Sequence, residues 1–230
     1  MVESPYLSKA IKETKKRNST SYYIKHGVLL SVDYALCLVY GKNYSMKCFQ
    51  SSLAIQYLLE LIGIHSQVHG GAACFGRALE NECCTIGWSG FWGDETHAWV
   101  VTEFRELIDL TISQLHIHPK SQTQDEAVPI IWYSPIDKFP VIIRYEPSGE
   151  AKGKLLPQEW AEVDKLKVLA QERFEKYFQS PLLEPNLPAP LLTGPESLQR
   201  LHNAGNRWLN KCILIQHQKI PLPDFFTMKM

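Results

Sequence analysis

The sequence predicts an α+β fold in which a helix that begins near a cysteine packs on an antiparallel sheet. Residues 46–63 read MKCFQSSLAIQYLLELIG, and from Ser51 onward their apolar residues are dense enough to bury most of a helix. Short segments rich in β-branched and aromatic residues follow. A helix followed by several short strands is typical of an α+β protein and not of an alternating parallel sheet.

Four further helices are expected around this one, at residues 5–16, 22–40, 158–177 and about 196–216. Gly63 follows the last apolar residue of the cysteine helix, where a left-handed cap is least costly. Asn43 and Ser45 are the candidate N-caps, which would place Cys48 in the first turn.

Strands are expected at residues 64–74, 83–88, 97–101, 107–111, 130–133 and 141–145. The connector at 102–106 is short enough for an antiparallel hairpin. Residues 87–93 alternate glycine with aromatic residues, which predicts an aromatic loop. The proline-rich stretch 180–194 predicts an extended connector.

Length and composition indicate a single globular domain, with a core at about 22–145 and a helical extension at about 155–220. Lys and Arg number 24 and Asp and Glu also number 24, which disfavours nucleic acid or a membrane surface as a partner. The N-terminal stretch lacks the apolar run of a secretory signal. The six cysteines lack the spacing of a disulfide framework, so a cytoplasmic location is expected, and the oligomeric state is left open.

Three residues form a candidate catalytic site. Cys48 would meet the unpaired N–H groups of a helix N-terminus, which stabilise a thiolate. His97 and Asp109 fall on the two strands of the expected hairpin, on one face if residue 97 pairs with residue 109. His97 would then act as the base for Cys48, and Asp109 would orient the imidazole.

The segments CFQSSLAIQYLLELIGI, HAWVV and LIDLT resemble the core of the transglutaminase-like branch of the papain-like fold, over about residues 44–111. The separations 97−48=49 and 109−97=12 are typical of that branch. The resemblance implies a cysteine enzyme that forms a thioester with a small-molecule, peptide or protein acyl substrate and needs no cofactor or metal. Hydrolysis by an amidase or peptidase is favoured, while transamidation and acetyl transfer remain open, as does a non-catalytic scaffold that keeps the fold.

Other side chains have competing interpretations. Trp88, Trp92 and Trp99 could line a substrate cleft or pack in the core. A zinc site made of Cys74, the Cys83-Cys84 pair and His97 is disfavoured because adjacent residues on a strand point to opposite faces. His65 with His69, and His116 with His118, have spacings that could suit a metal, but solvated, core-edge or loop positions are favoured for them.

Overall fold

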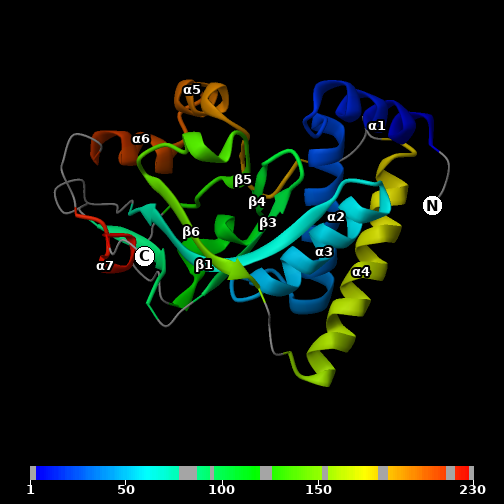
Figure 1. Cartoon of the computed structure of the whole chain (residues 1–230), viewed down its shortest axis with the longest axis horizontal. Coiled ribbons are helices and arrows are strands. Elements are labelled where there is room, and N and C mark those ends of the chain that lie inside the picture. Colours follow the sequence, from blue (N-terminus) through cyan, green and yellow to red (C-terminus); the bar gives the residue numbers. More distant parts are fainter. Residues whose placement is uncertain are drawn as a thin grey trace.

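The computed structural model describes residues 4–77, 87–93, 96–119, 126–151, 155–180, 186–215 and 221–227. In these residues the chain has an α+β fold, with helices around a mixed, mostly antiparallel sheet. The helices at the N-terminal end and the long α4 (Pro157–Tyr177) lie together on one side of the sheet, and α5 (Pro195–Asn203) and α6 (Arg207–Ile215) lie at its other end (Figure 1). None of the helices in the described ranges combines the length and apolar character needed to cross a membrane.

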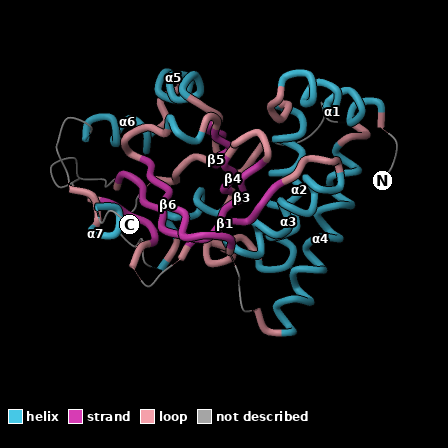
Figure 2. Tube along the Cα trace, viewed as in Figure 1, coloured by secondary structure: helices cyan, strands magenta, loops and turns pink. Residues whose placement is uncertain are grey.

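The strands are β1 (Ser66–Gly76), β2 (Trp88–Phe91), β3 (His97–Thr102), β4 (Leu107–Asp109), β5 (Ile130–Tyr133), β6 (Ile143–Glu150) and β7 (Leu191–Leu192). The sheet has the strand order β2-β1-β3-β4-β5-β7, and β6 pairs with β1 outside this path; Figure 2 shows β1 and β6 in magenta beside each other. Among the described residues all pairings are antiparallel except that of β5 with β7. The long strand β1 therefore joins β2 and β3 to β6.

One side of the sheet, which we call the α3 face, is covered by helices. These are α1 (Pro5–Arg17), α2 (Tyr22–Tyr40), α3 (Cys48–Leu61) and α4 (Pro157–Tyr177). Alternate strand residues, among them Val68, Val100 and Trp132, pack with them into one hydrophobic cluster. In α3 only Glu60 is exposed, which confirms the expected burial of this helix.

The α2 and α4 helices approach closely at Gly27. A β-carbon at this position would lie 2.8 Å from the ring of Tyr177 at the end of α4. The glycine thus lets the two helices meet, and α2 continues through it without a break. The α4 helix, expected from the sequence in a C-terminal extension, contributes to the same cluster as α2 and α3.

The opposite side of the sheet, which we call the His97 face, carries a second cluster. Its strand residues include Ala73, Phe91, Trp99 and Tyr133. It is covered in part by the 3₁₀ helix η2 (Thr111–Ile117) and by α6 (Arg207–Ile215), which contributes Trp208. The two clusters take alternate residues of the same strands, as expected for a sheet buried on both faces.

Several sequence expectations were wrong in detail. The predicted aromatic loop contains strand β2, because residues 88–91 pair with β1. The proline-rich connector contributes β7, which pairs with β5. The last predicted helix is two helices, α5 (Pro195–Asn203) and α6, which are separated by Gly205 at φ +75°. A short helix, α7 (Asp224–Thr227), follows them, and most of the predicted strand 83–88 lies outside the described residues.

A buried carboxylate ties the helices to the sheet. Glu106, in the β3–β4 turn, is fully buried and lies 3.1 Å from Lys25 Nζ of α2. It also accepts hydrogen bonds from the backbone N–H and hydroxyl of Thr20, from the Ser19 hydroxyl and from Nε1 of Trp132. Every hydrogen bond here joins segments that are distant in the sequence, so this carboxylate fixes how α2 meets the hairpin.

We expect Glu106→Gln to destabilise the fold by about 3–5 kcal/mol, because it leaves the buried Lys25 ammonium without its counter-charge. Urea unfolding followed by circular dichroism measures the change. The matched control is Glu103→Gln, an exposed residue of the same turn, which should change stability by less than about 1 kcal/mol. Equal effects of the two substitutions would contradict a special role for Glu106.

Candidate active site

Cys48 is the first residue of α3, as the sequence predicted for the first turn. The predicted N-caps were wrong. Lys47 occupies the N-cap position without a side-chain cap, and Ser45 instead hydrogen-bonds Asn43 within the preceding turn. The first N–H groups of α3 are therefore left without a capping side chain next to the half-buried Cys48 thiol.

His97 begins β3 and Asp109 ends β4, and the two strands pair as the predicted hairpin. The register differs from the predicted one, because Val101 lies opposite Leu107 and so Asp109 lies opposite Trp99. The shift spans two residues, which leaves His97 and Asp109 on the same face. The imidazole therefore reaches the carboxylate diagonally, with Nε2 2.6 Å from Oδ2.

Asp109 is nearly completely buried, but each of its oxygens is satisfied. Oδ2 accepts hydrogen bonds from His97 and, at 2.9 Å, from the Tyr145 hydroxyl. Oδ1 accepts from the Thr111 hydroxyl and the Ile112 N–H, both at 3.1 Å. A buried carboxylate with this many donors keeps its charge and its position.

The His97 ring interacts with Asp109 through a hydrogen bond and with Cys48 through its charge. Its Nδ1, the ring nitrogen that Asp109 does not use, is buried and has no hydrogen-bond partner within the described ranges. Burial lowers the pKa of the imidazole. The charges of Asp109 and Cys48, together with the hydrogen bond to Asp109, outweigh burial and raise the pKa of His97 to about 10.

The pKa of the Cys48 thiol is shifted in the opposite direction. Burial raises its pKa, but the positive charge of the His97 ring and the nearby Ala98 backbone N–H together hold the pKa below its ordinary value. The pair is thus suited to a thiolate and an imidazolium near neutral pH. Cys37, Cys74 and Cys212 differ from Cys48, because burial outweighs the other effects there and the pKa of each of these thiols is raised.

The three tryptophans proposed from the sequence occupy different places. Trp99 is 1% exposed and packs against Tyr145 with ring centroids 5.0 Å apart. Trp88 and Trp92 are half-buried. The register of β2 places Trp88 on the opposite face from Phe91, and Phe91 is the residue that stacks on His97. Their contact with a substrate stays a prediction.

Tyr145 is a member of the site that the sequence did not reveal. It lies on β6, and its hydroxyl reaches the same Asp109 oxygen as His97. Burial and the charge of Asp109 raise the pKa of Tyr145 well above its ordinary value, so it remains a donor. No local motif marks this tyrosine, because its role arises only when β6 pairs with β1.

In the described part of the chain, no group of three or more His, Cys, Asp or Glu residues is arranged so that it could hold a metal ion. His69 lies on β1 and His116 on η2. The Cys83-Cys84 pair considered for zinc lies outside the described residues.

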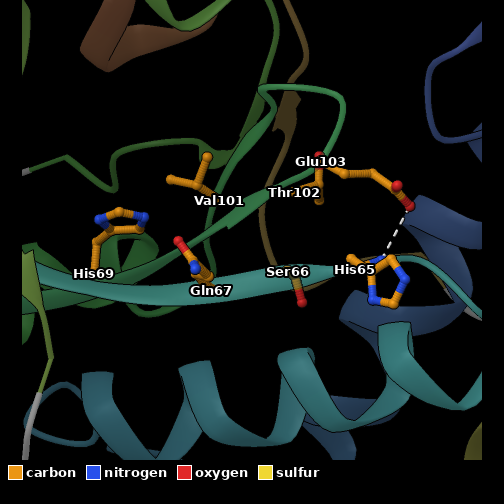
Figure 3. Close-up of a pocket in the computed structure, with 7 residues that line it drawn as sticks. All are labelled: His65, Ser66, Gln67, His69, Val101, Thr102 and Glu103. Atoms are coloured by element: carbon orange, nitrogen blue, oxygen red, sulfur yellow. Dashed lines mark hydrogen bonds between the residues drawn. The ribbon is translucent and has the colours of Figure 1, made fainter.

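A separate cavity of about 400 Å³ lies toward the other end of β3. It is lined by His65, Ser66, Gln67, His69, Val101, Thr102 and Glu103. Figure 3 shows these side chains and the hydrogen bond from the His65 backbone N–H to Glu103, at 3.0 Å. Val101 is four residues from His97, or about 13 Å along a strand, so this cavity does not surround the thiol.

The chain was compared with models of protein families, with curated proteins and with solved structures, and none of these comparisons finds a match. The chemistry of the site therefore has to be inferred from its own residues.

We expect Tyr145→Phe to lower stability by about 1.5–3 kcal/mol, because it removes a hydrogen bond to a buried charged acceptor. Tyr133→Phe is the matched control. Its hydroxyl donates to the neutral Lys138 carbonyl at 2.9 Å in the same hydrophobic cluster, so about 1 kcal/mol should be lost. Urea unfolding measures both. A smaller loss for Tyr145→Phe than for its control would show that Asp109 does not depend on this bond.

The pKa shifts predict how Cys48 reacts with iodoacetamide. Because its pKa is depressed, the reactive thiolate persists below the pH at which an ordinary cysteine becomes protonated, and it is lost only as pH falls through the depressed value. His97→Ala removes the main lowering cause and leaves the effect of burial, so the rate at pH 6 should fall about tenfold or more. Mass spectrometry of the alkylated peptides follows each cysteine, with Cys37 as the slow internal reference.

Proposed function

We propose that the protein is a cysteine enzyme that transfers or hydrolyses acyl groups through a thioester on Cys48. The observation that carries this proposal is the hydrogen bond between His97 and the buried carboxylate of Asp109, beside a half-buried thiol at a helix N-terminus whose pKa the His97 charge lowers. In the same proposal, the α3 helix and the antiparallel strands β1, β3 and β4 correspond to a papain-like or transglutaminase-like core.

In the first half of the reaction the Cys48 thiolate attacks the carbonyl carbon of an amide, ester or thioester. A sulfur–carbon bond forms and the carbonyl π electrons move to oxygen, which gives a tetrahedral oxyanion. The oxyanion then collapses, and the bond to the leaving group breaks. The proton that this group needs comes from the His97 imidazolium, so a neutral imidazole and a thioester remain.

In the second half the neutral His97 takes a proton from water, or from an amine in a transfer reaction, as that acceptor attacks the thioester. Collapse of the second intermediate releases the acyl product and restores the Cys48 thiolate and the His97 imidazolium. Asp109 supports the charged form of the ring throughout. We favour water as the acceptor, which makes the enzyme an amidase or a peptidase.

The negative charge on the carbonyl oxygen needs a donor close to the sulfur. The backbone N–H of Cys48 is such a donor, because the first N–H groups of a helix have no partner within the helix. The positive end of the α3 dipole lies at the same place. Loss of one donor of this kind typically costs about 2.7–4 kcal/mol of transition-state stabilisation.

The test is to trap the acyl-enzyme with 4-nitrophenyl acetate. We expect a burst of nitrophenolate and the mass of one acetyl group on Cys48. Cys48→Ala should abolish both. Asp109→Asn should keep the fold and slow acylation by roughly 10³–10⁴-fold, as the loss of an orienting carboxylate does in related chemistry.

Cys37→Ala is the matched control, since it removes another half-buried cysteine whose thiol pKa is raised. It should leave the burst unchanged. Acetylation spread over several cysteines, or none at Cys48, would contradict the proposal and favour a non-catalytic scaffold.

A further inference from the structure

We propose that Phe91 is a positioning residue for His97, held in place by His118. This inference rests on the proposed function, and it adds a residue that acts on the imidazole from outside the chain of Cys48, His97 and Asp109. The Phe91 ring lies flat against the His97 ring, with centroids 4.7 Å apart and planes 8° apart. The His118 ring meets the Phe91 ring edge-on, with the two centroids 5.0 Å apart and the two planes at 90°.

The sheet brings these rings together. Both β2 and β3 pair with β1, and Phe91 lies opposite Ala73 while His97 lies opposite Gly71. Two residues along one strand correspond to about 7 Å and to the same face. At Gly71 a β-carbon would lie 2.1 Å from the Glu146 carbonyl of β6, so no larger residue fits on β1 opposite His97.

The stacking of Phe91 on His97 constrains the orientation of the imidazole plane, which the hydrogen bond to Asp109 leaves free. A single hydrogen bond at Nε2 fixes one point of the imidazole but lets the ring rock about that bond. A ring stacked on its face fixes the plane, and the plane decides whether Nδ1 points at the Cys48 sulfur. Phe91 is itself 8% exposed, so it cannot move aside without disturbing the cluster that surrounds it.

The contact also favours the charged form of His97. The face of an aromatic ring attracts a cation, and more strongly where the two are shielded from water. The ring covers the imidazole, which is 2% exposed, and so excludes water from the ion pair. His118 does not add a second charge of the same sign, since burial and the charge of His97 lower its pKa.

Phe91 therefore favours the thiolate and imidazolium pair over the neutral pair. Leucine or methionine at this position keeps the site apolar and covered but removes the aromatic face. We expect Phe91→Leu to raise the pH midpoint of Cys48 alkylation by iodoacetamide by about 0.5–1 unit. The limiting rate at high pH should not change, because the thiolate forms there without help from the imidazolium. Phe91→Tyr keeps the stacked ring and should retain the wild-type midpoint.

Phe174→Leu is the matched control for the loss of a buried ring. It is 1% exposed and belongs to the cluster on the α3 face, so it should lower thermal stability without moving the midpoint. A folded Phe91→Leu with the wild-type midpoint overturns the inference, and Phe91→Met applies the same criterion if the leucine variant does not fold. A wild-type Cys48 that titrates as an ordinary thiol overturns the proposed function together with this inference.

Discussion

The site depends on one buried carboxylate and the donors that surround it. Burying the charge of Asp109 without partners would cost several kcal/mol. Here its two oxygens accept from an imidazole, a phenol, a hydroxyl and a backbone N–H. These donors come from β3, β6 and the start of η2, so the carboxylate can stay charged only if these segments fold together. The charge that these donors stabilise at Asp109 is in turn one of the causes that raise the pKa of His97.

The sheet separates this chemistry from the structural core by the alternation of side chains along its strands. In β3, Ala98 and Val100 pack under the helices on the α3 face, while His97 and Trp99 lie on the other side. The Ala98 backbone N–H nevertheless lies near enough to the Cys48 sulfur to lower the pKa of the thiol. The thiol, carried by the helix on one face, is therefore influenced by a ring carried on the other face, at the first residues of β3.

The second buried carboxylate, Glu106, has a different role. It lies in the turn between the two strands that carry His97 and Asp109, and it binds Lys25, Ser19, Thr20 and Trp132. The network fixes the position of α2 against the hairpin and involves no residue of the candidate site. Glu106 and Asp109, three positions apart, thus have different roles. Glu106 joins the helices to the sheet, and Asp109 binds the imidazole next to the Cys48 thiol.

The sequence by itself determined the α+β class, the helix that carries Cys48 in its first turn, the strands that carry His97 and Asp109, and the face these two share. These features depend on local periodicity. Asp109 lies opposite Trp99 and not opposite His97 as predicted, but a register difference of two residues leaves side chains on the same face of the strand. The tertiary structure alone decided the places of Tyr145, Phe91 and Glu106. Their partners are distant in the sequence. The pairing of β2 and β6 with β1 brings Phe91 and Tyr145 to the site, and the packing of α2 against the β3–β4 turn brings Lys25 to Glu106; neither arrangement leaves a local pattern. Hydrogen bonds and ring contacts of this kind form only when the strands and helices have assembled, because the separate segments cannot hold the partner side chains in place.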